Sequence, residues 1–294
     1  MNVNYELYKV FYYVAKHLSF SKAADELFIS QSAVSQSIKS LEEELNTSLF
    51  IRSTKKVNLS KEGEILLKHI EPALNLIKSG ERNIQEINSF EKGEIHIGAN
   101  DTISKDFLLP YLKKFHQLYP QIHIQITNRT SSTCVELLKQ GTVDLIITNL
   151  PNNNISDFME VKEIFTFKDI FISGYDFKKL QGREIELKDL ADYPILMLEK
   201  KTTTRRFFDK LMDNFEIEIT PEVELGSIDL LIEMAKIGLG ISFVPDYCIN
   251  TANRELFKVD IKEELPARKL AVVTNKNIPF SIASQKFMEL LIKI

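Results

Sequence analysis

The stretch FSKAADELFISQSAVSQSIKSLEEELN (residues 20–46) holds two helical patterns separated by only a few residues. In the first, the small side chains Ala23 and Ala24 fall on an inward face, where a second helix can cross closely. Ser30 is placed to cap the second helix. The apolar stripe of that helix recurs at helical spacing and consists of Val34, Ile38, Leu41 and Leu45. The stretch therefore predicts two packed helices joined by a tight turn, with Asn46 ending the second.

The flanking residues extend this motif on both sides. Leu7, Val10, Phe11 and Val14 repeat at steps of three and four residues, which predicts an amphipathic helix before it. The segment SLFIRSTKKVNLS (residues 48–60) reads as a strand, a polar turn and a second strand. Three helices and a hairpin with basic residues predict a winged helix-turn-helix domain over residues 1–59.

The polar face of the second helix carries no charge at its start, where Gln31, Ser32, Ser35 and Gln36 lie. Gln and Ser can both donate and accept hydrogen bonds at base edges in the major groove. Basic residues farther along can contact phosphates, and these are Lys39, Arg52, Lys55 and Lys56. We therefore predict that this domain binds double-stranded DNA. The alternative is an ordinary three-helix bundle with polar caps.

Composition is that of an ordinary globular protein, with 294 residues, 44% hydrophobic residues, 27% charged residues and a net charge of −4. The chain shows no apolar run long enough for a bilayer and no export signal, which favours the cytoplasm and no membrane partner. Cys134 and Cys248 match no metal or redox spacing. Cys134 begins a predicted helix, whose dipole can lower a thiol pKa, so a redox role is a minor alternative.

Residues 60–89 predict a long linker helix with a narrow apolar stripe: Leu67, Ile70, Leu74, Ile77 and Ile84. A narrow stripe suits a partner helix, so we expect these residues to form a homodimer. The alternative is a helix that lies on its own domain. Pro72 predicts a kink or a restart within the segment.

From Gly93 onward the pattern changes to alternating strands and helices. The alternating segment EIHIGAN and the apolar run VDLIIT are examples of the strands. Strand and helix in turn predict an α/β fold with a largely parallel sheet, and the length suits two similar lobes. The fold class is thus multidomain, with an all-α winged helix-turn-helix domain, a linker helix and a two-lobed α/β domain over residues 93–294.

The segment SFSKAADELFISQSAVSQSIKSLEEELNTSLFIRSTKKVNLSKEGE resembles the N-terminal signature of LysR-type transcriptional regulators, and the layout of the whole chain continues the resemblance. The family often has Pro, Arg and Gly where Ser32, Gln36 and Asn46 stand. The resemblance implies a regulatory part similar to periplasmic solute-binding proteins, with a first lobe of about 93–161 and 267–294 and a second of about 162–266. It also implies operator or promoter DNA, a small-molecule effector, a dimer of dimers and RNA polymerase as partners.

Three hydroxyl-rich segments, NDTIS, RTSST and KTTTR, follow predicted strands or precede predicted helices. Ligands bind at such junctions in open α/β sheets, and helix N-termini favour anions. We therefore predict a small anionic effector, such as a carboxylate. Its predicted contacts are Asn100, Thr102, Ser104, Ser131, Thr133, Thr203, Thr204, Ser227 and, as a counter-charge, Arg205.

Two other functions compete with that of a regulator. A free-standing solute-binding protein would need an export signal, which the N-terminus does not show. An enzyme would need a nucleophile–base pair, a metal set or a phosphate loop, and the sequence indicates no such motif and no cofactor.

Overall fold

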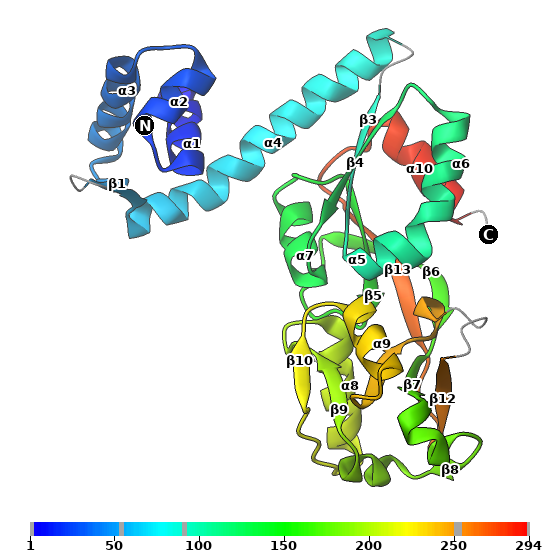
Figure 1. Cartoon of the computed structure of the whole chain (residues 1–294). Coiled ribbons are helices and arrows are strands. Elements are labelled where there is room, and N and C mark those ends of the chain that lie inside the picture. The colour runs from blue at the N-terminus through cyan, green and yellow to red at the C-terminus, as the bar shows by residue number, and fades with distance from the viewer. Residues whose placement is uncertain (1–2, 53–55, 90–92, 250–254, 293–294) are drawn as a thin grey trace. The chain divides into compact units, whose positions relative to one another are not determined.

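The computed structural model describes residues 3–52, 56–89, 93–249 and 255–292 (Figure 1). The chain divides into two compact units, residues 1–81 and 82–294, which are described separately. Within the described residues, no helix combines the length and the apolar character that crossing a membrane requires.

The first unit begins with helices α1 (Tyr5–His17), α2 (Phe20–Leu27) and α3 (Gln31–Leu45). Ser19 and Ser30 cap α2 and α3, because their hydroxyls accept from the amides of Lys22 at 3.3 Å and Ala33 at 3.2 Å. Both helices end in the left-handed conformation, at Phe28 and Asn46. The helix–turn–helix geometry therefore follows from caps that are local in sequence.

The core of this unit contains the predicted apolar stripe of α3. Val34, Ile38 and Leu41 are fully buried against Phe11 of α1 and Ala23 of α2. Strands β1 (Phe50–Arg52) and β2 (Val57–Leu59) pair antiparallel and form the hairpin that follows α3. This unit thus has the three helices and hairpin of a winged helix-turn-helix.

Helix α4 (Lys61–Ser89) follows the hairpin as one continuous helix. It contains Pro72 in its interior, so the predicted restart at this residue does not occur. Its first turns belong to the core of the first unit, where Leu67 and Ile70 pack.

The second unit holds two sheets. The first has the order β4-β3-β5-β13-β6. Its strands are β3 (Glu94–Ala99), β4 (His123–Asn128), β5 (Leu145–Leu150), β6 (Met159–Phe167) and β13 (Arg268–Asn275). β3 pairs parallel with β4 and β5, whereas β13 runs antiparallel to β5 and β6.

Helices cover both faces of this first sheet. Its helices are α5 (Asp101–Ile103), the π-helical turn η1 (Ser104–Leu108), α6 (Leu109–Leu118), α7 (Ser131–Lys139) and α10 (Ile282–Ile292). α6 and α10 lie side by side, with the rings of Phe115 and Phe287 at 5.1 Å between centroids (Figure 1). α7 packs through Cys134 and Val135 against a separate cluster that includes Val273. This sheet with its helices is called lobe I.

The second sheet has the order β10-β9-β11-β7-β12-β8. Its strands are β7 (Asp169–Gly174), β8 (Glu184–Ile185), β9 (Ile195–Leu198), β10 (Val223–Leu225), β11 (Ile241–Pro245) and β12 (Leu256–Ile261). Helix α8 (Thr203–Asn214) packs on one face through Phe208, and α9 (Ile228–Lys236) packs in a second cluster through Leu231. Short 3-10 helices complete the lobe: η2 (Tyr175–Leu180), η3 (Leu187–Asp192) and η4 (Asp246–Cys248). This sheet with its helices is called lobe II.

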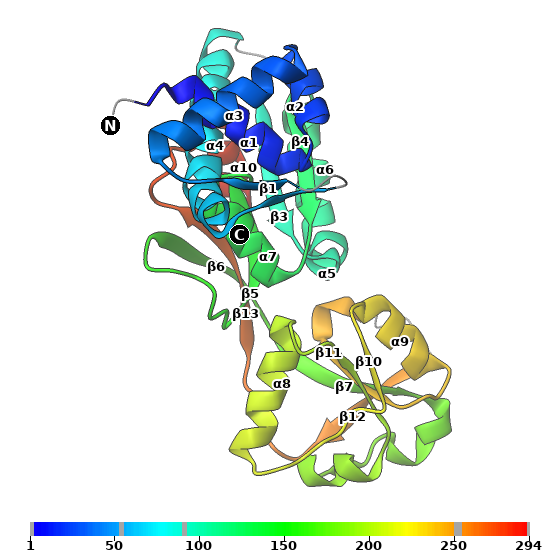
Figure 2. The ribbon, with the colours of Figure 1, turned by 90° about the vertical axis from the view of Figure 1, so that its left-hand side faces the viewer.

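The chain passes between the lobes twice. It leaves lobe I between β6 and β7, where only Lys168 separates the two strands, and it returns between β12 and β13 (Figure 2). The first sheet therefore extends past residue 161, the expected end of the segment, to Phe167. Because two neighbouring segments connect the lobes on one side, residues of both lobes can line the space between them.

Candidate functional site

The start of α3 presents the uncharged polar face that the sequence indicates. Gln31, Ser32 and Gln36 are exposed, and Ser35 is half-buried. The hydroxyl of Ser21 donates to Oε1 of Gln31 at 3.1 Å, and the hydroxyls of Ser30 and Ser32 lie 2.9 Å apart. No acidic side chain lies in the first turn of α3, so nothing there would repel a phosphate backbone.

Charge on α3 begins beyond this face and is partly structural. Glu42 accepts from the backbone amides of Leu49 at 2.7 Å and Phe50 at 3.2 Å, which ties α3 to the first strand of the hairpin. Lys39 is exposed and lies 3.7 Å from Glu43. Glu42, near the end of α3, thus holds the hairpin against the helix. This structural role accounts for the position of Glu42 beyond the polar face.

The predicted phosphate contacts of the wing are described only in part. Lys56 is exposed beside β2. Arg52 ends β1, but its side chain is not among those described, and Lys55 lies outside the described residues.

The predicted dimerisation stripe of α4 divides into two parts. Leu67 and Ile70 pack against the core of their own unit, as the alternative interpretation predicted. Leu74 is half-buried, whereas Ile77 and Ile84 are 59% and 61% exposed. Only the later part of the stripe therefore presents large apolar side chains to solvent.

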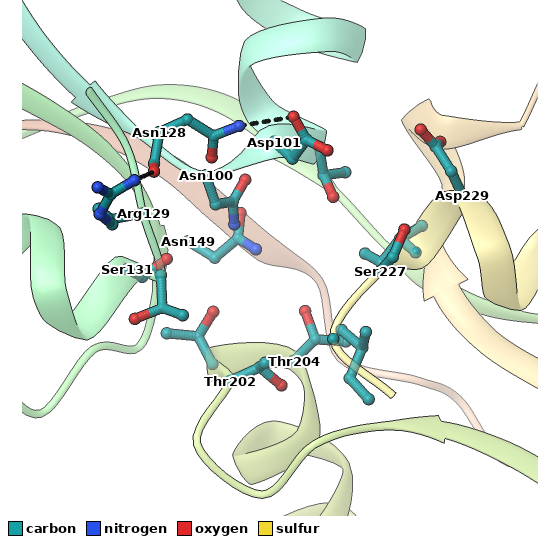
Figure 3. A pocket seen from close by; sticks show the side chains of 16 residues that line it. Asn100, Asp101, Asn128, Arg129, Ser131, Asn149, Thr202, Thr204, Ser227 and Asp229 are labelled. Atoms are coloured by element: carbon teal, nitrogen blue, oxygen red, sulfur yellow. Dashed lines mark hydrogen bonds between the residues drawn. The ribbon is translucent and has the colours of Figure 1, made fainter. Parts of the chain in front are cut away.

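A cavity of about 300 Å³ lies between the two lobes of the second unit (Figure 3). The following residues line it: Asn100, Asp101, Thr102, Asn128, Arg129, Thr130, Ser131, Asn149, Leu198, Thr202, Thr203, Thr204, Gly226, Ser227, Ile228 and Asp229. The structure thus brings together six residues that the sequence proposed separately, namely Asn100, Thr102, Ser131, Thr203, Thr204 and Ser227.

Three helices begin at this cavity. The cap residues of α7, α8 and α9 are Thr130, Thr202 and Ser227, and each of them lines it. Their hydroxyls accept from backbone amides in the first turns at 3.4, 3.2 and 3.4 Å. Helix N-termini carry partial positive charge, so the field of three of them favours an anion in the cavity.

Three charged side chains line the cavity: Asp101, Arg129 and Asp229. Arg129 is the one basic residue among the lining residues, and its Nη1 donates to the backbone oxygen of Asn128 at 2.7 Å. Both aspartates have partners, because Asp101 accepts from Nδ2 of Asn128 at 2.7 Å and Asp229 pairs with Lys105 at 2.7 Å. Lys105 belongs to lobe I and Asp229 to lobe II, so their ion pair joins the lobes beside the cavity.

Two buried polar side chains at the cavity are incompletely hydrogen-bonded. Ser131 and Asn149 are 5% and 2% exposed. Neither Oγ of Ser131 nor Oδ1 of Asn149 has a hydrogen-bond partner among the described residues. A buried polar atom without a partner costs about 1–3 kcal/mol. Such a cost is expected at a binding site, where a ligand or a solvent molecule supplies the missing hydrogen-bond partner.

Three predicted effector contacts do not line the cavity. Arg205 is buried and bonded within lobe II, to Asp209 and Glu224 at 2.7 Å each and to the backbone oxygen of Leu198 at 3.0 Å. These partners use its charge, so Arg205 is not the counter-charge of the cavity. Ser104 lies in η1, and Thr133 is bonded to Thr130 at 3.0 Å in the first turn of α7.

Sequence reasoning missed several lining residues. Arg129 begins the segment RTSST, so its neighbours marked its position although it was not itself selected. Asn149 follows the apolar run VDLIIT, and a polar residue at the end of a buried strand was the available signal. Thr202 lies within KTTTR, next to the predicted contact Thr203. Only the structure shows that Thr202 caps α8.

Cys134 does not have the lowered pKa that the helix dipole suggested. Its thiol is fully buried, and this burial raises its pKa to about 11. Burial likewise raises the pKa of Cys248. No cluster of three or more His, Cys, Asp or Glu residues suited to a metal ion occurs in the described ranges.

Comparison with known proteins agrees with both units. Residues 5–64 match the bacterial regulatory helix-turn-helix protein family of the lysR type, and residues 88–293 match the LysR substrate binding domain. A probable RuBisCO transcriptional regulator from Cyanidium caldarium is 30% identical over 280 residues, which cover 92% of this chain and 87% of the relative.

Solved structures show the same fold. Full-length CbnR complexed with its target DNA gives a TM-score of 0.70 at 18% identity, with 98% of this chain and 99% of CbnR covered. The regulatory domain of CcmR from Synechocystis, in complex with 2-PG, gives 0.63 at 22% identity and covers 68% of this chain and 96% of that domain. The chain therefore belongs to the LysR family and is a DNA-binding transcriptional regulator with an effector-binding domain.

Proposed function

We propose that the cavity between the lobes binds a small anionic metabolite that controls DNA binding by the first unit. The observation that carries this proposal is the convergence of three helix N-termini and Arg129 on one cavity. An anion there gains the field of the helix ends and hydrogen bonds from lining hydroxyls and amides. The volume of about 300 Å³ limits the ligand to a small molecule.

Two further observations support an anion rather than a neutral ligand. The aspartates of the cavity already have partners in Asn128 and Lys105, which reduces their repulsion of an anion. A regulatory domain of the same fold, that of CcmR, has been solved with 2-PG bound. Carboxylates and phosphates therefore form the first class of ligands to test.

We also propose that the first unit binds double-stranded operator DNA as a homodimer. The exposed face of Gln31, Ser32 and Gln36 is suited to base edges, and the exposed Lys39 on α3 and Lys56 in the hairpin are suited to phosphates. The exposed apolar side chains of Ile77 and Ile84 supply the contact between copies of the chain. We propose a cytoplasmic location on the same ground, since a regulator of this kind acts where its operator DNA lies.

Isothermal calorimetry on the full chain tests the anion site, with inorganic phosphate, a panel of small carboxylates and 2-PG as probes. We expect Arg129→Gln to weaken binding of the anion that binds wild type, roughly 10- to 100-fold, because a hydrogen bond to a charged group is lost. Arg206→Gln is the matched control, since Arg206 is exposed on α8 and does not line the cavity. Equal losses in the two variants, or binding of neutral sugars in preference to anions, would contradict the proposal.

A further inference from the structure

A buried ion pair lies where the chain crosses between the lobes. Asp169 is the first residue of β7, and Arg268 is the first residue of β13. Nη1 of Arg268 donates to Oδ2 of Asp169 at 2.8 Å, and both side chains are 1% exposed. The pair therefore joins the two segments that connect the lobes, the one between β6 and β7 and the one between β12 and β13. This region is called the hinge.

The remaining hydrogen bonds of Arg268 reach one residue of each lobe, Leu150 in lobe I and the cavity residue Thr204 in lobe II. Its Nε donates to the backbone oxygen of Leu150, the residue after Asn149 in lobe I. Its Nη1 also lies 3.4 Å from the hydroxyl oxygen of Thr204 in lobe II. One guanidinium thus bonds a lining residue of lobe II and the neighbour of a lining residue of lobe I.

Aromatic rings from both lobes enclose the same group. The guanidinium carbon lies 5.3 Å from the ring centre of Phe167 in β6 and 4.6 Å from that of Phe207 in α8. Rings at this distance stabilise a desolvated cation through the negative potential of their faces. An aromatic face has no fixed hydrogen-bonding direction, so the hydrogen bonds to Asp169, Leu150 and Thr204 set the orientation of the guanidinium.

The hydrogen bonding of the pair is incomplete. Arginine and carboxylate groups commonly form two parallel bonds, but only Nη1 and Oδ2 are bonded here. Nη2 of Arg268 and Oδ1 of Asp169 are buried without a partner among the described residues. The hydroxyl of Tyr247, which packs on Phe167, is also buried without a partner there. Unpartnered atoms at one hinge indicate an arrangement that a small rotation of the lobes can complete.

We propose that Arg268 is a positioning residue that sets the separation of the cavity walls, and that its pair with Asp169 alternates between one and two hydrogen bonds as the lobes rotate. Thr204 links this pair to the cavity, because its oxygen accepts from Arg268 while its hydroxyl hydrogen remains available to a ligand. A ligand that accepts this hydrogen strengthens the bond from Arg268, since linked hydrogen bonds polarise one another. The link to ligand binding rests on the function proposed above, whereas the role in lobe separation does not.

The test measures the separation of the lobes by pulsed electron spin resonance in the full chain without ligand. Spin labels are placed at Gln117→Cys on α6 and Lys210→Cys on α8, which are exposed positions in lobe I and lobe II. Labelled chains are diluted with unlabelled ones, so that distances within one chain dominate. Cys134 is buried, and the half-buried Cys248 is replaced by Ser, so that the engineered cysteines react selectively.

Arg268→Lys keeps the charge but removes the planar fork, and Arg205→Lys is its matched control. Arg205 is also buried and bonded to two carboxylates, yet all these partners belong to lobe II. We expect both variants to lower the melting temperature, but only Arg268→Lys to shift or broaden the distance distribution, by more than about 2 Å. Unchanged distances in Arg268→Lys, or equal changes in both variants, would overturn the proposal.

A second comparison covers the case in which Arg268→Lys does not fold. Thr204→Val removes the oxygen that accepts from Arg268, and Thr204→Ser retains it. We expect a shifted distribution for the first and a wild-type distribution for the second. Identical distributions for the two variants would overturn the proposal. Addition of inorganic phosphate, followed by calorimetry, reports separately on the anion site, so a failure to bind phosphate leaves the distance measurements as an independent test of the hinge.

Discussion

Uncharged polar side chains gather at helix N-termini in two regions of this chain, the start of α3 and the cavity between the lobes. At α3 a single helix end is exposed, and its polar groups are bonded to neighbours such as Ser21 and Ser30. In the cavity three helix ends converge, and Ser131 and Asn149 are buried with atoms that lack partners among the described residues. The same residue types therefore suit the groove of a DNA duplex at the start of α3 and a small enclosed ligand in the cavity.

The two regions also differ in how many copies of the chain form the complete binding site. In the proposed complex with DNA, one α3 face reads a half-site, so recognition of a full site would need a second copy of the chain. The cavity, in contrast, takes its walls from the two lobes of one chain. The cost in stability differs too, because the polar groups at the start of α3 have partners, whereas Ser131 and Asn149 each bury an atom that lacks one among the described residues.

The largest expected effect comes from breaking the dimer. We expect Ile77→Glu with Ile84→Glu to give monomers and to abolish operator binding, because charge at an apolar contact between helices is not tolerated. Affinity of the cavity for its anion should stay unchanged. Sedimentation, DNA retardation and calorimetry on the same preparation measure the three quantities. Ile65→Glu is the control, as Ile65 is exposed on α4 outside the stripe. A dimeric double variant would refute the assignment of this surface.

The next effect is on stability of the first unit. We expect Glu42→Ala to lower the free energy of unfolding by about 1.5–3 kcal/mol, because the amides of Leu49 and Phe50 lose a charged acceptor. Glu43→Ala removes a neighbouring exposed carboxylate and should change it by less than about 0.5 kcal/mol. Urea denaturation followed by circular dichroism measures both variants. Similar values would show that Glu42 does not anchor the hairpin.

A smaller effect separates base contacts from phosphate contacts. We expect Gln31→Ala and Gln36→Ala each to reduce discrimination between a selected DNA site and random DNA by roughly 1–3 kcal/mol. Lys56→Ala should weaken binding to both DNAs alike and flatten the dependence on salt. Fluorescence anisotropy at several salt concentrations measures these differences. A uniform loss in all three variants would mean that the polar face does not read bases.

The smallest stability effect is expected in the cavity. Ser131→Ala removes a buried hydroxyl that has no partner among the described residues, so the melting temperature should stay the same or rise slightly. Anion affinity should fall by a few-fold, because a neutral hydrogen bond contributes about 1 kcal/mol. Thermal melting and calorimetry with the anion found for wild type measure both. A clear loss of stability would show that the hydroxyl has a structural role.

Elements whose signals are local could be predicted from the amino-acid sequence. Ser19 and Ser30 lie within three residues of the amides that they cap, and the stripe of Val34, Ile38 and Leu41 lies on one helix. The alternation of strands and helices after Gly93 likewise predicted the α/β fold of the second unit. Caps and periodicity act over a few residues, so they can be read along the chain.

The polar residues that share the cavity, and the charges that remain available to it, could not be predicted from the sequence and follow from the folded arrangement. Arg129 and Arg205 both lie beside Ser/Thr-rich helix starts, but Glu224, on another strand, is bonded to Arg205, whereas Arg129 lines the cavity. Leu67 and Ile77 belong to one stripe, yet the core of the first unit covers only Leu67. Arg268 and Asp169 meet across 99 residues. These outcomes depend on contacts between segments that are far apart in the sequence. A local sequence pattern carries no information about the free energies of such contacts.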